Sequence, residues 1–286
     1  MIARTLFVSD LDGTLLGPDA TLSDYSRDTL RSLIACGLLF TVATARTAPS
    51  IRAMLGDLAL PLPVIQQNGA LVSDLVTGRH LMIQALAPDL AAQVMAAIDR
   101  HGLRAFVATA DHDDDHLYYG ELPNPAMVWY RDEKLAFGDP RLRPVADLRV
   151  ALAEQVVGVT LLAEPDALAA LAAELRATHG DALQLHLFEN LYIPGWWELS
   201  IHDREATKSA AIGKLRRALD LASRRLIVFG DGINDLDMFR GADHAVAVEN
   251  AVPELLAIAG ELAARNDQDG VVRWIAAAVA VAAREA

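Results

Sequence analysis

The sequence predicts an α/β protein whose core is a Rossmann-like parallel sheet, with a second, α+β domain inserted into it. The first observation is an alternation of short β-prone runs with helical segments, near the N-terminus and again after residue 207, which is typical of βαβ units. The second is a change of texture between these two blocks, over roughly residues 83–192. The third is a pair of acidic residues directly after one strand of each block, where the ligand site of an open parallel sheet lies.

Hydrophobic periodicity and turn residues define the elements of the two outer blocks. In the first block we expect strands at 5–9, 38–43 and 64–67, and helices at 24–35 and 50–58. In the second block we expect helices at 208–221, about 235–239 and 252–264, with strands at 225–229 and 245–248. The Ala-rich run WIAAAVAVAA predicts a terminal helix.

The middle of the chain predicts a separate domain. Two Ala/Leu-rich helices are expected at 88–101 and 165–179, with β-prone pieces and the polar, aromatic-rich stretch DHDDDHLYYGELPNPAMVWYRDEK between them. No fixed period supports a repeat. We therefore predict a core formed by residues 1–82 and 193–286, and a separate α+β domain inserted at 83–192.

Composition excludes several classes of function. The 286 residues are 53% apolar and 22% charged, which argues against disorder and allows one large domain or two smaller ones. A net charge of -13 without a long Lys/Arg run disfavours nucleic acid and anionic membrane surfaces as partners. The single cysteine, Cys36, cannot form an intramolecular disulfide and is expected to be a small core residue. Without a signal peptide or a membrane span, we expect a cytoplasmic protein, monomeric or a small homo-oligomer.

Four acidic residues are the candidates for chemistry. Asp10 and Asp12 leave the first strand one residue apart, and Gly13 permits a sharp turn directly after them. Asp231 and Asp235 follow the strand RLIVF. Four carboxylates at one sheet edge would repel each other unless a cation were bound. Mg²⁺ is the natural candidate because it prefers oxygen ligands.

These residues belong to a wider set of motifs. DLDGT at 10–14, TAR at 44–46, Lys208 and GDGIND at 230–235 resemble, in order and spacing, the four motifs of the haloacid dehalogenase-like superfamily. NGA at 68–70, the large insertion and NDQDGV at 266–271 are similar to the Cof-type sugar-phosphatase branch, whose α/β cap is inserted at the same point. The resemblance covers the whole chain, but the cap matches only in placement and texture. It implies that the inserted domain at 83–192 is an α+β cap that sets substrate specificity.

The resemblance implies a phosphatase that acts on a small phosphorylated metabolite, such as a sugar phosphate or a phosphorylated cofactor. Asp10 would form an aspartyl-phosphate, and Asp12 would act as general acid and then as base, with its backbone carbonyl on the metal. Catalysis would involve Asp10, Asp12, Thr44 and Lys208, and the substrate would contact Thr44, Ala45, Arg46, Asn68, Gly69 and Lys208. Mg²⁺ would be held by Asp10, Asp12 and Asp231, with Asn234 and Asp235 close behind, partly through water.

The sequence departs from the family pattern at three places. Ala45 replaces a glycine in the second motif, and Glu205-Ala206-Thr207 precedes Lys208 where the family commonly has Gly-Val-Ser or Gly-Val-Asn. Glu249 replaces a glycine before Asn250. The last two affect details on the substrate side and remove no catalytic group.

Alternative interpretations remain open from the sequence. A phosphomutase or other phosphotransferase of the same superfamily would keep Asp10 and Asp12, and a non-catalytic binding or regulatory module could retain the same core. Arg46 could be a surface charge, or could reach the substrate phosphate or the Asp10 loop.

The cap leaves its own alternatives. The run from His112 to His116 is more typical of an exposed loop than of a metal site, and His186 and His202 are expected to be structural. Substrate contacts in the cap could come from aromatic residues or from the segment that rejoins the core, which gives as candidates Trp129, Tyr130, Trp196, Trp197, Glu189, Asn190 and Tyr192.

Overall fold

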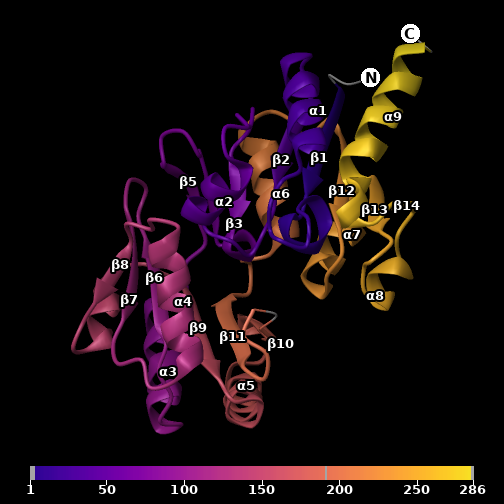
Figure 1. Ribbon diagram of the computed structural model, residues 1–286. Helices are drawn as coiled ribbons and strands as arrows, with labels where there is room; N and C mark the ends of the chain where they lie inside the picture. The colour runs from indigo at the N-terminus through magenta and orange to yellow at the C-terminus, as the bar shows by residue number, and fades with distance from the viewer. Residues whose placement is uncertain (1–3, 191, 285–286) are drawn as a thin grey trace. The chain divides into compact units, whose positions relative to one another are not determined.

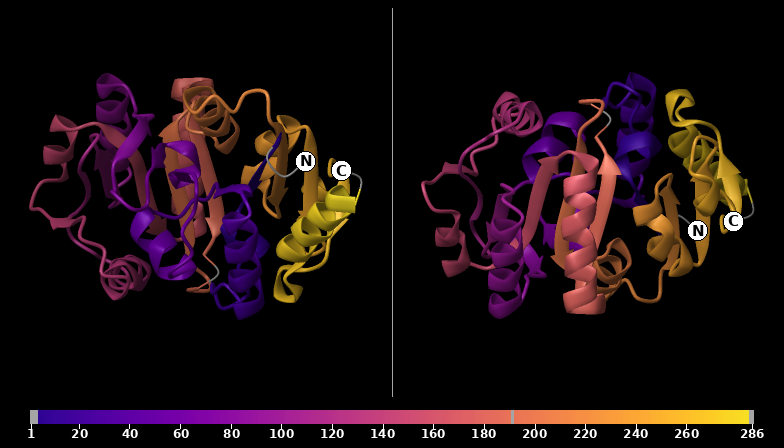
Figure 2. Two further views of the ribbon diagram at one scale, coloured as in Figure 1. Left: turned by 90° about the horizontal axis from the view of Figure 1, so that it is seen from above. Right: turned by 90° about the horizontal axis from the view of Figure 1, so that it is seen from below.

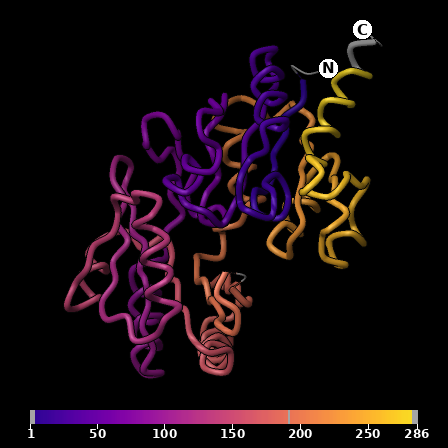
Figure 3. Tube along the Cα trace, viewed as in Figure 1, coloured from indigo at the N-terminus to yellow at the C-terminus, as the bar shows by residue number. Residues whose placement is uncertain are grey.

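The computed structural model describes residues 4–190 and 192–284, and it confirms the predicted fold class. The chain divides into two compact units, the first comprising Met1–Thr77 and Thr207–Ala286 and the second Gly78–Ala206. The chain leaves the first unit once and returns to it once, as the tube in Figure 3 shows by its colours. The second unit is longer at both ends than the 83–192 segment predicted from the sequence.

The first unit is built on a parallel sheet of five strands in the order β14-β13-β12-β1-β2. The first unit contains the strands β1 (Thr5–Ser9), β2 (Leu39–Val42), β3 (Val64–Gln66), β4 (Leu71–Ser73), β12 (Arg225–Gly230), β13 (His244–Val248) and β14 (Glu261–Ala263). Of these, β3 and β4 are not in the five-stranded sheet. Its helices are α1 (Asp24–Ala35), α2 (Ala48–Leu55), α6 (Lys208–Ala218), α7 (Leu236–Arg240), α8 (Pro253–Leu256) and α9 (Gly270–Arg284).

The centre of this sheet is buried on both faces. Every residue of β1 is buried, as is usual for a strand between helical layers, and its sequence TLFVS is accordingly a continuous β-prone run. Figure 2 shows α1 and α9 on one side of the sheet and α6 on the other. The chain moves outward from β1 to β2 on one side and from β12 to β13 on the other, so the ends of β1 and β12 flank a topological switch point.

Two expectations for this unit were wrong. The segment predicted as one helix at 252–264 is the short α8 followed by β14, because residues 261–263 pair with β13 at the edge of the sheet. This pairing outweighs the helix propensity of an Ala/Leu-rich run. Cys36 is exposed, because it lies at the C-cap of α1, where the chain turns at the surface.

The second unit contains a six-stranded sheet in the order β10-β11-β9-β6-β7-β8, labelled in Figure 1. The second unit contains the strands β5 (His80–Ile83), β6 (Phe106–Ala110), β7 (Asp115–Tyr119), β8 (Leu142–Pro144), β9 (Val156–Ala163), β10 (Leu183–Glu189) and β11 (Trp197–Asp203). Of these, β5 is not in the six-stranded sheet. Its helices are α3 (Pro88–Arg100), α4 (Pro125–Ala136) and α5 (Pro165–His179). The unit extends past residue 192 because β11 pairs antiparallel with both β9 and β10.

Apolar side chains of α3 and α5 form one core with the inward-facing residues of the sheet. Helix α4, which the sequence analysis did not separate from its polar surroundings, packs against the other face, where Tyr130 lies 4.7 Å from Phe106 between ring centroids. Asn124 caps α4 by accepting a hydrogen bond from the Met127 amide, and Pro125 occupies its first turn. This Asn-Pro pair was the missed signal for a helix start.

The acidic stretch at 111–116 is only partly the exposed loop expected from the sequence. Asp111 to Asp114 form a turn, but Asp115 begins β7, and its carboxylate lies 3.2 Å from the buried Arg141 guanidinium. Over residues 4–190 and 192–284, no helix is both long and apolar enough to cross a bilayer.

Candidate active site

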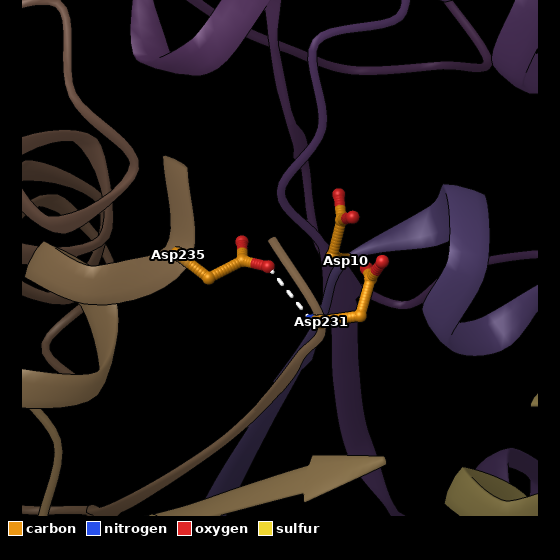
Figure 4. A group of neighbouring side chains, drawn as sticks. All are labelled: Asp10, Asp231 and Asp235. Carbon is orange, nitrogen blue, oxygen red and sulfur yellow. Dashed lines mark hydrogen bonds between the residues drawn. The ribbon is translucent and has the colours of Figure 1, made fainter. Parts of the chain in front are cut away.

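Three carboxylates meet at the ends of β1 and β12. Asp10 directly follows β1, Asp231 directly follows β12, and Asp235 lies in the helical turn before α7. One oxygen from each lies within 4.8 Å of the others. Figure 4 shows Asp10 and Asp231 side by side with the Asp235 carboxylate facing them. The structure thus brings together three of the five residues expected to lie around a metal.

A buried lysine joins two of these acids. Lys208 is the first residue of α6, and its side chain is 1% exposed. Its Nζ donates to Asp10 Oδ1 at 2.8 Å and to Asp235 Oδ1 at 2.6 Å. The Thr207 hydroxyl caps the helix by accepting a hydrogen bond from the Ala210 backbone amide, which fixes the start of α6 and thereby the position of Lys208. The ammonium therefore holds the Asp10 carboxylate in a defined orientation.

Asp235 has both of its oxygens engaged. Its Oδ1 accepts from Lys208, and its Oδ2 accepts from the backbone amides of Asp231 and Gly232, each at 3.0 Å. The bond to the Asp231 amide is the dashed line in Figure 4. Asp235 thereby shapes the loop that carries Asp231. Asp231 Oδ1 in turn accepts from the Thr14 hydroxyl at 2.6 Å.

The electrostatics of the cluster suit a cation. Burial raises the pKa of Asp10 well above its ordinary value, against the lowering effect of Lys208, and neighbouring acids add to the rise. Burial also raises the pKa of Asp231 to about 6. Burial alone would lower the pKa of Lys208, but the Asp10 and Asp235 carboxylates outweigh it and raise that pKa. One ammonium among three acids leaves negative charge that a divalent ion bound to Asp10 and Asp231 would neutralise.

Asp12 is not part of this group. Both of its carboxylate oxygens bind Arg46, with Nε donating to Oδ2 at 2.9 Å and Nη2 to Oδ1 at 2.8 Å. The Arg46 side chain is 12% exposed, so the pair is largely protected from water. Of the roles left open for Arg46, the structure therefore brings it to the Asp10 loop.

Thr44 and Asn68 lie on neighbouring segments of the same edge. Thr44 is buried, and its Oγ1 accepts from the Arg46 amide at 3.1 Å, while its backbone carbonyl accepts from the Asn68 amide. The Asn68 side chain accepts from Asn234 Nδ2 at 3.1 Å. Asn234 thus contacts Asn68 and lies outside the group of Asp10, Asp231 and Asp235. Ala45, next to Thr44 in the chain, is exposed.

The turn from Gln67 to Gly69 has an unusual backbone. Gln67 and Asn68 are both left-handed, with φ of 50° and 55°, and Gly69 has φ of 105°. A Cβ on Gly69 would lie 2.3 Å from the Thr207 carbonyl oxygen, so only glycine lets this turn approach the start of α6. Gly69 therefore acts on the site through packing.

The sequence analysis missed three residues at this edge. Thr14 is the last residue of the DLDGT motif, and this position could have marked it as a residue of the site. Asn250 donates to the Gly13 carbonyl, and only its place in a motif marked it. Gln67 is buried, and its Nε2 has no hydrogen-bond partner among the residues described. Nothing in its sequence context distinguished it.

The cap candidates all lie in the second unit. Trp129 stacks on Tyr192, with ring centroids 5.8 Å apart and an interplanar angle of 16°. Tyr130 is instead packed on Phe106, next to the Lys134 ammonium. His202 is buried, with its Nδ1 2.9 Å from the Val157 carbonyl oxygen.

Two phosphatases are similar to this chain in sequence over most of its length. The chain is 27% identical over 276 residues to a 5-amino-6-(5-phospho-D-ribitylamino)uracil phosphatase of Bacillus subtilis, covering 94% of this chain and 96% of that protein. It is 29% identical over 249 residues to an HMP-PP phosphatase of Cronobacter sakazakii, covering 87% and 85% of the two chains.

Solved structures share the fold. TM0651 of Thermotoga maritima superposes with a TM-score of 0.74 at 23% identity, over 94% of this chain and 95% of that one. The subclass IIB sugar phosphatase BT4131 superposes with a TM-score of 0.73 at 18% identity, over 95% and 97%. The family model for haloacid dehalogenase-like hydrolases matches residues 7–275, nearly the whole sequence. The chain therefore belongs to the haloacid dehalogenase-like hydrolase family.

Proposed function

We propose that this protein is a Mg²⁺-dependent phosphatase that hydrolyses small phosphomonoesters through an aspartyl-phosphate on Asp10. The observation that supports this most is the shared ammonium of Lys208, which holds the Asp10 carboxylate beside a fixed positive charge. Positioning and charge stabilisation dominate phosphoryl transfer, so a buried carboxylate with such a partner suits the reaction.

The chemistry takes two displacements. An Asp10 carboxylate oxygen attacks phosphorus, the ester P–O bond breaks, and Asp12 donates a proton to the leaving oxygen. Water then attacks the same phosphorus, Asp12 takes its proton, and the bond to Asp10 breaks to release phosphate. The Thr44 hydroxyl accepts from Arg46 but donates its own proton to no described residue, so it can donate to a phosphoryl oxygen.

Arg46 controls Asp12 in this scheme. Its guanidinium binds both Asp12 oxygens in a two-point pair, which orients the carboxylate that must exchange a proton with the leaving group and with water. An incoming phosphoryl group would compete for the same guanidinium. The pair would thereby couple substrate arrival to the release of Asp12.

The residues present fit a divalent cation. Asp10 and Asp231 offer carboxylate oxygens at one point, with Asp235 behind them, and these three acids lie around the one ammonium of Lys208. Hard oxygen ligands favour Mg²⁺. When bound, Mg²⁺ would neutralise charge on the transferred phosphoryl group.

Substrate identity belongs to the second unit in this proposal. We propose that it acts as the specificity cap, with the stacked Trp129 and Tyr192 as candidates for contact with a planar ring. The substrates to be tested form a panel of sugar phosphates, p-nitrophenyl phosphate, 5-amino-6-(5-phospho-D-ribitylamino)uracil and HMP-PP. The last two are taken from the names of two relatives.

Phosphate release from this panel tests the function. We expect turnover with Mg²⁺, loss of turnover in EDTA, and no turnover in Asp10→Asn, whose amide is a poor nucleophile of nearly the same size. Circular dichroism and gel filtration would show whether the variant is folded. A folded Asp10→Asn protein that retains activity would contradict the aspartyl-phosphate route.

A further inference from the structure

Two asparagines late in the chain bind the loop that follows Asp10. Asn250 Nδ2 donates to the Gly13 carbonyl oxygen at 2.7 Å. Asn266 Nδ2 donates to the Leu16 carbonyl oxygen at 2.8 Å. The two residues are joined, because the backbone N–H of Asn266 donates to the side-chain Oδ1 of Asn250 at 2.9 Å. One connected pair of residues therefore holds two points of the same loop.

The loop at residues 11–16 needs such support. It is a helical turn broken at Asp12, with φ -69° and ψ 128°, and at Gly13, with φ 72°. Its closing backbone bond runs from the Leu16 amide to the Leu11 carbonyl at 2.9 Å. Because the regular helical backbone is interrupted at these two residues, the placement of Asp12 depends also on contacts from outside the loop.

The segment that begins at Asn250 also bonds to the second acidic loop. The Val252 amide donates to the Asp231 carbonyl at 2.8 Å. Gly13 itself lies against Asp231, since a Cβ there would be 2.4 Å from Asp231 Oδ2. Asn250 and Val252 thus connect Gly13 on one loop with Asp231 on the other, and set the spacing between them.

From these contacts we infer that Asn250 and Asn266 are positioning residues for phosphoryl transfer, because they fix where Asp12 lies relative to Asp10 and Asp231. This inference rests on the proposed function. Neither side chain binds Asp10 or the Asp12 carboxylate, so their effect passes through the Gly13 and Leu16 carbonyls. The inference gives Asn266, the first residue of the NDQDGV motif at 266–271, a role in the reaction. The two displacement steps themselves assign no role to this motif.

The same turn supplies a matched control. Asp269, three residues after Asn266, accepts hydrogen bonds from the Ser23 and Ser26 hydroxyls at the start of α1. None of these contacts reaches residues 11–16. Asp269 has a left-handed backbone, with φ 59°, which glycine adopts without strain, so Asp269→Gly removes the hydrogen bonds cleanly.

The experiment compares Asn250→Ala, Asn266→Ala and Asp269→Gly with the wild type, using p-nitrophenyl phosphate and Mg²⁺. We expect Asn250→Ala to lower kcat by about 10- to 100-fold, the usual cost of a small misplacement of a reacting group. We expect KM to change by less than about threefold, because substrate binding is not removed. Asn266→Ala should act in the same direction, and Asp269→Gly should lower Tm while kcat stays at the wild-type value.

Hydrogen exchange on the metal-free proteins gives a second measurement that does not depend on turnover. Amides of residues 11–17 should exchange faster in Asn250→Ala and at the wild-type rate in Asp269→Gly. A folded Asn250→Ala with kcat within about twofold of wild type would overturn the inference, as would an equal loss of kcat in Asp269→Gly. A wild type that releases no phosphate from any substrate would instead overturn the proposed function.

Discussion

Single residues at the acidic edge differ in how many partners they have. Lys208 satisfies two carboxylates with one ammonium, and Asp235 accepts from three donors, so each is fixed from several sides. Both oxygens of the Asp12 carboxylate bind the Arg46 guanidinium. The group proposed to move protons is therefore oriented by a two-point pair with an arginine.

Arg46→Lys tests this dependence. A lysine keeps the positive charge but cannot bind both Asp12 oxygens in a fixed fork, so we expect kcat to fall by about 10- to 100-fold with little change in Tm. Arg31→Lys is the control, because Arg31 also donates to both oxygens of one acid, Asp57, on the exposed surface. Unchanged kcat in Arg46→Lys would show that two-point binding of Asp12 is unnecessary.

The prediction that four acids meet at one sheet edge is confirmed for three of them, whereas Asp12 binds Arg46. Asp10, Asp231 and Asp235 were placed together because strand ends of a parallel sheet share an edge, and the structure has them within 4.8 Å. The contacts of Asn250 with Gly13 and of Gln67 with Arg46 join residues far apart in sequence. Such pairs follow from the tertiary path of the chain, which local patterns do not encode.

At the level of elements, the start of α6 is set by a turn from elsewhere in the chain. Gly69 lies so close to Thr207 that the position of Lys208 depends on the absence of a side chain. Gly69→Ala should therefore destabilise the protein by at least about 1–3 kcal/mol and reduce activity as α6 is displaced. Chemical denaturation and kcat would be measured together.

Gly37→Ala is the matched control for this substitution. Gly37 has a similar backbone, with φ of 91° against 105° for Gly69, but a Cβ there would meet nothing within 4 Å. Its alanine variant should have only the cost of a left-handed residue, about 1–2 kcal/mol, and normal kcat. Equal kcat losses in both variants would argue against a specific role for the Gly69 contact.

Element predictions were reliable where local signals and tertiary packing agreed. Helices α1 and α5 have the predicted bounds, because their apolar periodicity and termini were clear in the sequence. The predictions of secondary structure failed where local sequence signals and tertiary packing disagreed. Residues 261–263 look helical locally but pair with β13. Helix α4 was hidden because it carries four charged residues, of which Lys134 is buried with its ammonium over the Tyr130 ring.

For the whole molecule, the acidic cluster predicts a link between metal binding and stability. A cation that binds only the folded state adds about 1.4 kcal/mol when its concentration is ten times the dissociation constant. Mg²⁺ should therefore raise the Tm of the first unit, and Asp231→Asn should reduce the rise. A Tm that is identical with Mg²⁺ and with EDTA would contradict the proposed site.

The second unit should lose stability in mild acid. Burial lowers the pKa of His202, so below about pH 6.5 the unfolded chain binds a proton that the folded unit does not. Stability then falls as the pH falls, by up to about 1.4 kcal/mol per pH unit for this group. His202→Asn should flatten that slope while keeping an amide donor for the Val157 carbonyl.

Tryptophan fluorescence can follow this unit, since Trp129, Trp196 and Trp197 lie in it and only Trp274 lies in the first. Denaturation would be measured at pH 8 and pH 5.5. The same pH slope in His202→Asn and wild type would assign acid sensitivity to another group, such as His80, whose pKa burial also lowers.

The insertion has a consequence for how the protein is made. Thr5 pairs with Arg225, so β1 gains its second neighbour only after the entire second unit has left the ribosome. Until then one edge of an apolar strand stays unpaired and open to self-association. We expect chains arrested near residue 206 to contain a folded second unit and a half-built sheet. The acidic cluster of Asp10, Asp231 and Asp235 is accordingly among the last parts of the nascent chain to form.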